Sequence, residues 1–229
     1  MGSPTGRHIV GRVKAVDDRA QMAAVSAVAA TVAGIPVRVA EVDAREAILR
    51  AGPVAVTLPR PGTSEGRQLR RWVTQLLVTE RLIAAEAAAR AVPADIPAPD
   101  EKDLLPDAAA RLEVGSIAAA ALADPRARAL FVEVTAGVDV AGPDVAAFHA
   151  RNPWRFAACR RSADGWYGEP DAAPALDDVR DLIVANLLGA ARRRAFRVWL
   201  DERRAALVHL APGYEHPGDP RQPDNTHRH

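Results

Sequence analysis

Three histidines near the carboxyl end are the residues of this chain best suited to metal chemistry. His216, His227 and His229 are three of the six histidines in the sequence. His227 and His229 lie two positions apart, so an extended backbone would project both rings to one side. Three imidazoles, completed by a carboxylate, are a ligand set for Zn, Cu or Ni. The tail is therefore a candidate site for a divalent transition metal, and an open position on the metal would suit hydrolysis or redox chemistry.

Two other interpretations of residues 211–229 stay open. The segment contains four prolines and almost no aliphatic side chains, so its composition alone cannot order it, and a polar tail without a ligand fits the pattern. A tail that is anchored by Tyr214 and folds back into a groove of the protein is the third interpretation. No other cofactor is indicated.

The other reactive side chains form no recognisable catalytic set, and the catalytic residues stay unknown. Cys159 is the only cysteine, so no intramolecular disulfide can form, and its thiol is interpreted as buried or incidental. His149 falls at the end of an expected helix, where packing or capping is favoured over general-base catalysis. The sequence contains no Gly-rich phosphate loop, Gly-x-Ser-x-Gly elbow, paired Cys motif or His-Glu-x-x-His.

Two aromatic residues and a basic run have competing interpretations. Trp166 and Tyr167 lie between glycines in an expected loop, where they contact a ligand or partner or pack back on the helices. The arginines of residues 192–194 and 203–204 form a basic strip with helical spacing, which is interpreted mostly as a solvated face of a long helix.

The composition limits the classes of partner. The 229 residues are 48% hydrophobic but only 4% aromatic, and the net charge is +1. Such a chain can bury a core. Its near-neutral charge argues against a dedicated nucleic-acid surface. No segment is long and apolar enough to predict a membrane span, and the start of the sequence lacks a secretory pattern. We expect a cytoplasmic protein that has neither nucleic acid nor a membrane as a partner.

Hydrophobic periodicity predicts a mainly helical chain with a small β ribbon, which is an α+β fold. Extended segments are expected near 9–16, on both sides of a turn at Gly34, and at 206–210. Prolines predict a linker over 92–109, and 157–176 is expected to be a polar loop. The expected helices cover residues 40–51, 65–91, 114–123, a stretch opening at Asp124-Pro125, 142–152 and 176–204.

The order of these elements resembles the SurA-like, parvulin-associated chaperone family. Thr31–Val42 is similar to the family's strand, turn and helix entry, and Trp72–Ala91 to its long helix. Val145–Phe156 is similar to its helix that ends in Asn-Pro and Phe, and Val179–Leu210 to its closing helix and strand. The chain departs from the family pattern at His149, where an aromatic residue is expected, and at Ala33, where the turn has Asn.

The resemblance implies a helical clamp closed by a C-terminal helix and strand. It predicts one domain over residues 1–210, followed by the tail 211–229. The family's prolyl-isomerase module would need at least about 50 residues, and residues 157–176 are too few to contain it. The resemblance therefore implies a clamp without the isomerase.

We expect a chaperone-like module that binds peptides or proteins and lacks prolyl-isomerase activity. The alternative is an accessory or tailoring enzyme of specialised metabolism that uses metal in the His-rich tail. Whether the protein is an enzyme stays undecided. The expected peptide-binding groove is lined by Leu76, Ile83, Phe131, Phe148, Phe156, Trp166 and Tyr167.

Overall fold

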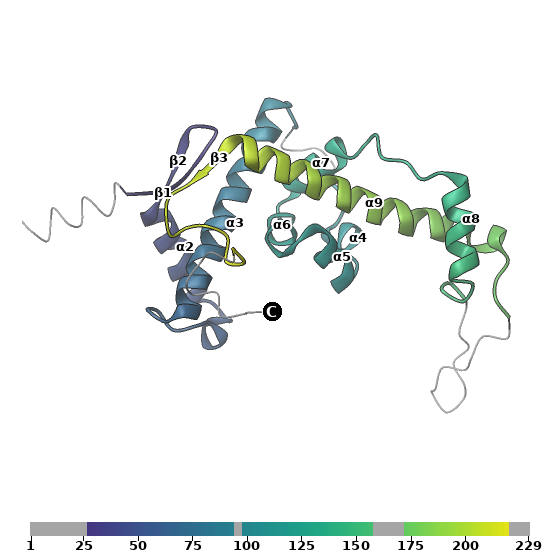
Figure 1. Cartoon of the computed structure of the whole chain (residues 1–229), viewed down its shortest axis with the longest axis horizontal. Helices are drawn as coiled ribbons and strands as arrows, with labels where there is room; N and C mark the ends of the chain where they lie inside the picture. Colours follow the sequence, from purple (N-terminus) through teal and green to yellow (C-terminus); the bar gives the residue numbers. More distant parts are fainter. Residues whose placement is uncertain (1–26, 94–97, 158–171, 220–229) are drawn as a thin grey trace, which may run out of the picture. The chain divides into compact units, whose positions relative to one another are not determined.

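A computed structural model describes residues 27–93, 98–157 and 172–219 (Figure 1). These residues are mostly helical and include one small antiparallel sheet, which confirms the predicted mainly α architecture with a β ribbon. Two compact units are present. Of the described residues, 27–93 and 201–219 form the first, here called the sheet unit, and 98–157 and 172–200 form the second, called the helical unit. Helix α9, Leu176–Leu207, begins in the helical unit and ends in the sheet unit. Because α9 belongs to both units, the division does not test whether residues 1–210 are one domain. The single domain stays a prediction.

One three-stranded sheet contains strands from both chain segments of the sheet unit. Strands β1 (Val28–Val32), β2 (Ile35–Arg38) and β3 (Val208–Leu210) lie in the order β2-β1-β3, and both pairings are antiparallel. Ala33 and Gly34 have φ of 49° and 80°, so both central residues of the β1–β2 turn have positive φ, as a type I′ hairpin requires. The predicted Gly34 turn and the predicted strand near 206–210 are both confirmed.

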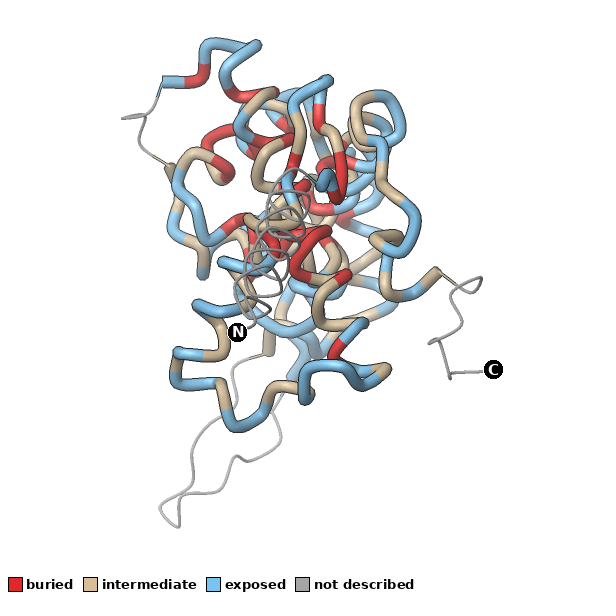
Figure 2. The backbone as a smooth tube through the Cα atoms, turned by 90° about the vertical axis from the view of Figure 1, so that its left-hand side faces the viewer, coloured by how far each residue is buried: buried red, intermediate tan, exposed pale blue. Residues whose placement is uncertain are grey.

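Helices α2 (Val39–Ala51) and α3 (Ser64–Ala89) pack with the sheet, and the 3-10 helix η1 (Ala55–Thr57) lies between them in the chain. Ala29, Val42 and Val73 form a buried cluster. Helix α3 begins where the sequence predicts it, because the Thr63 hydroxyl accepts a hydrogen bond from the Gly66 N–H at 3.0 Å. Figure 2 marks the buried residues of the chain in red.

The first residues of the C-terminal tail dock on α3. Tyr214 packs against the cluster of Ala29, Val42 and Val73. Its carbonyl oxygen accepts a hydrogen bond from Gln75 Nε2 at 2.8 Å. Residues 211–219 are thus tied to the sheet unit, with Tyr214 in the anchoring position that the sequence suggested.

The helical unit is built from short helices and most of α9. The helices α4 (Glu101–Leu104), α5 (Ala108–Val114), α6 (Ser116–Ala121), α7 (Pro125–Val134) and α8 (Gly142–Arg151) precede α9. The start of α7 and the end of α8 lie where the sequence predicts them. Asp124 caps α7 by accepting a hydrogen bond from the Arg126 N–H at 2.7 Å, and α8 ends before Asn152.

Two sequence predictions differ from the structure in this unit. Residues 92–109 were expected to lack regular structure, but they contain α4 and the start of α5. Prolines flank α4 without interrupting it, so they restrict its length rather than prevent it. The helix predicted over 114–123 is α6, but it begins at Ser116, because Gly115 has a φ of 89° that separates it from α5.

Candidate binding pocket

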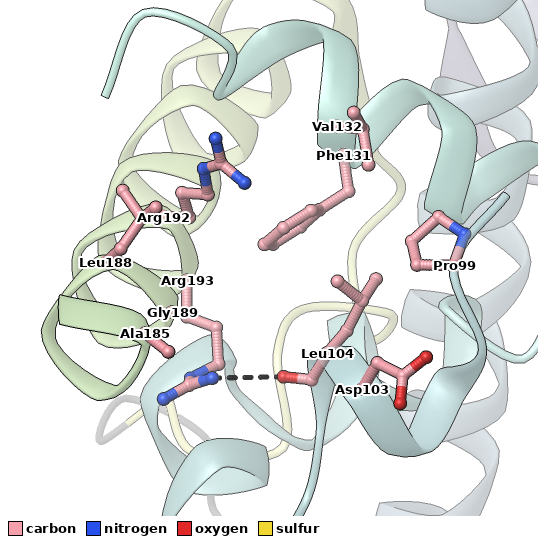
Figure 3. Close-up of a pocket in the computed structure, with 10 residues that line it drawn as sticks. All are labelled: Pro99, Asp103, Leu104, Phe131, Val132, Ala185, Leu188, Gly189, Arg192 and Arg193. Atoms are coloured by element: carbon pink, nitrogen blue, oxygen red, sulfur yellow. Dashed lines mark hydrogen bonds between the residues drawn. The ribbon is translucent and has the colours of Figure 1, made fainter. Parts of the chain in front are cut away.

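A pocket of about 370 Å³ lies within the helical unit (Figure 3). This volume is at the lower end of the range for sites that bind small ligands. Helices α4, α7 and α9 and the segment before α4 form its wall. The lining residues are Pro99, Asp103, Leu104, Phe131, Val132, Ala185, Leu188, Gly189, Arg192 and Arg193.

One face of α9 forms a side of the pocket. Ala185, Leu188, Gly189 and Arg192 recur at intervals of three and four residues, so they share one helical face. Two of these four side chains are very small. Their size leaves space beside α9 that larger residues would fill.

Phe131 gives the pocket an apolar and fixed surface. Its side chain is only 2% exposed, and its ring centroid lies 5.0 Å from that of Phe196. Phe196 is fully buried and stacks on Trp199 with centroids 5.5 Å apart. Because this aromatic stack fixes the Phe131 ring, the pocket does not depend on a mobile side chain there.

Arginine side chains hold the α4 side of the pocket. Arg193 donates from Nη1 to the Leu104 carbonyl at 3.1 Å and from Nε to the Glu113 carboxylate at 2.6 Å. Arg128 donates from Nε to the Pro99 carbonyl at 2.6 Å. A helix of four residues has little intrinsic stability, so these contacts are what position Leu104 and Pro99.

Arg192 differs from its neighbour Arg193. Its side chain is on the α9 side of the pocket and faces Phe131 across it (Figure 3). Its Nε is buried without a hydrogen-bond partner, and within the described residues no ion pair or hydrogen bond involves it. Asp103, the acidic lining residue, lies on the far side of Leu104 from α9. The pocket is therefore apolar with a cationic group on one side.

The structure places the predicted groove residues in different surroundings. Phe131 lines the pocket. Phe148 and Phe156 pack together with ring centroids 6.3 Å apart, and both are partly buried against the cluster of Val145, Val179 and Ile183. Leu76 and Ile83 are buried in α3 of the sheet unit. Side chains that are this buried contact a client only after rearrangement, so the groove they were predicted to form stays a prediction.

Several predicted residues lie outside the described part of the chain. These are Cys159, Trp166, Tyr167, His227 and His229. The metal site in the tail therefore stays a prediction.

Two of the described histidines have local roles. His149 Nε2 lies 2.9 Å from the Pro174 carbonyl oxygen, as expected for a histidine that packs at a helix end. His216 Nδ1 accepts a hydrogen bond from the Gly218 N–H at 3.0 Å. Partial desolvation, followed by the positive charge of Arg204, lowers the pKa of His216. Across 27–93, 98–157 and 172–219, no three His, Cys, Asp or Glu residues gather as a metal site.

The pocket was not predicted from the sequence. The interpretation of residues 192–194 as a solvated face is wrong for Arg193, which is 8% exposed and paired with Glu113. A usable signal was present, because Ala185, Gly189 and Arg192 lie on one helical face and combine small side chains with a cation. That spacing does not predict which residues form the wall of the pocket opposite α9.

Comparison with known proteins adds one partial match. Residues 28–65, which cover β1, β2, α2, η1 and the start of α3, match a family of unknown function (DUF7158). No curated protein and no solved structure matches the chain. The matched segment lies in the sheet unit.

None of the helices in the described ranges combines the length and apolar character that a bilayer span needs. The cytoplasmic location stays a prediction.

Proposed function

We propose that this chain is a polypeptide-binding, chaperone-like module that takes an apolar client side chain into the pocket of the helical unit. The pocket itself is the observation that carries the proposal. Its apolar lining from Phe131, Leu104 and Leu188 suits an aliphatic or aromatic side chain. Removing such a side chain from water contributes about 1.5–3 kcal/mol.

The chemistry of the lining supports binding over catalysis. In the described chain, the lining contains no histidine, cysteine or serine. Of its two arginines, Arg193 is held by Glu113 and Leu104. The proposal includes what the SurA-like resemblance implies, which is a helical clamp without the prolyl-isomerase module. Negligible turnover in a prolyl-isomerisation assay is the expected result, and robust turnover would contradict that part.

A client-binding measurement with a filled pocket tests the proposal. Reduced, carboxymethylated α-lactalbumin, which stays unfolded, is labelled and titrated with the full chain while fluorescence anisotropy is recorded. Ala185 lines the pocket and is exposed, so Ala185→Trp fills the space without disturbing the core. Ala146 is exposed on α8 and is not a lining residue, so Ala146→Trp is the matched control.

We expect Ala185→Trp to weaken binding roughly 10- to 100-fold, which is the equivalent of one excluded apolar side chain. The control should bind as the unchanged protein does. Absence of client binding, or equal binding by the two variants, would show that the pocket is not a client site.

A further inference from the structure

The pocket contains a cation whose partner is missing from the described chain. Arg192 and Arg193 are adjacent and chemically identical, yet only Arg193 has a carboxylate partner, Glu113. Arg192 Nε is buried and makes no hydrogen bond. A buried donor without an acceptor is unfavourable, and a guanidinium offers further donors in a planar fork. The geometry of a carboxylate matches that fork, because its two oxygens accept two parallel N–H bonds.

We infer that the pocket selects a polypeptide segment in which a carboxylate adjoins an apolar side chain, and that Arg192 binds the carboxylate. This inference rests on the proposed function, since it names the ligand class of the same pocket. The apolar side chain would lie against Phe131 and Leu104 while the carboxylate meets Arg192. Asp103 lies beyond Leu104 from α9, so it does not neutralise the cation.

Two sources in a polypeptide supply this chemistry. One is a free C-terminal carboxylate after an apolar last residue. The other is an Asp or Glu side chain next to an apolar residue within a chain. Both present the same anion beside the same kind of apolar group, and capped peptides distinguish them.

The test uses the full chain and three fluorescent peptides of one length. The first ends in two leucines with a free carboxylate, and the second is the same peptide as its C-terminal amide. The third is amidated and has Glu before its Leu. We expect the first or the third to bind about 10- to 100-fold more tightly than the second, which is the range for a hydrogen-bonded charged group.

Variants on one helix test the role of Arg192. Arg192→Gln should reduce acid binding to the level of the amide, while Arg192→Lys should retain part of the preference. Arg194 is exposed on the same helix and is not a lining residue, so Arg194→Gln should leave the preference unchanged. Arg192 is only partly buried, and circular dichroism checks that the variants fold.

The outcomes separate this inference from the proposed function. Equal binding of all three peptides would overturn the carboxylate selection and leave the apolar pocket standing. Binding of none of the peptides, together with no binding of unfolded α-lactalbumin, would overturn both proposals. Octanoate serves as a small-molecule probe, and binding of octanoate without any peptide would replace a polypeptide ligand with an aliphatic acid. An acid preference that survives Arg192→Gln would also contradict the inference.

Discussion

Arg193 should hold the α4 wall of the pocket, and replacing it with methionine tests this directly. Its side chain is buried and donates to Glu113 at 2.6 Å and to the Leu104 carbonyl at 3.1 Å. Gly189 leaves room for the guanidinium, because a Cβ at that position would lie 3.2 Å from Arg193 Nη1. Arg193→Met keeps most of the apolar stem and removes both donors.

The expected destabilisation follows from these two bonds. Both bonds have the charged guanidinium as donor, and a hydrogen bond that involves a charged group contributes about 1.5–3 kcal/mol. The Glu113 side chain is 32% exposed, so water solvates it once Arg193 is gone. We therefore expect a loss of about 2–3 kcal/mol in the opening free energy of the helical unit, below the sum of the upper values.

Hydrogen exchange measures this loss where it occurs. The Leu105 N–H donates to the Glu101 carbonyl at 2.8 Å and ends α4, so its amide reports on the wall. A loss of about 2–3 kcal/mol lowers protection roughly 30- to 150-fold. Peptides from the sheet unit, such as those from β1, should change much less.

Two comparisons make the result decisive. Arg180→Met removes an exposed ion pair with Asp177 at 2.9 Å, which should change protection by less than about threefold. Adding Glu113→Gln to Arg193→Met should cost little beyond the single change, because the two residues act as a pair. A loss of protection in Arg193→Met no larger than that in Arg180→Met would refute the reasoning.

Three further predictions concern other parts of the fold. Lowering the pH below 6.5, the ordinary pKa of histidine, should weaken the docking of the tail at His216. The pKa of His216 is lowered in the folded protein, so its contribution to stability is complete above pH 6.5 and is lost as the pH falls through that lowered pKa. Exchange of tail amides measures this, and His216→Gln should remove the dependence. Gly66→Ala should destabilise the sheet unit by about 1–3 kcal/mol in urea unfolding, because the new Cβ would overlap the Arg60 carbonyl oxygen. Gly137→Ala, which meets nothing within 4 Å, is its control, and equal effects would refute the steric argument. Asp124→Ala should lower the stability of α7 by about 0.5–2 kcal/mol through the lost cap, and unchanged protection of α7 amides would contradict this.

Local chemistry made the secondary structure of this chain largely predictable. Asp124 followed by Pro125 specifies a helix start within two residues. Gly34 specifies a hairpin turn by the backbone conformation it allows. Helical periodicity located α3 and α9 to within a few residues. Such signals are readable because each depends on neighbours only a few positions away.

Long-range contacts decided the candidate site. Arg192 and Arg193 are adjacent and identical in type, and the sequence predicted one solvated role for both. The structure brings Glu113, 80 residues away, to Arg193 and to no other arginine in the run 192–194 among the described contacts. It also sets Phe131 of α7 opposite α9, where small residues leave a pocket. Helical spacing determines which side chains share a face, but only packing determines what that face meets, because the partner comes from a distant part of the chain.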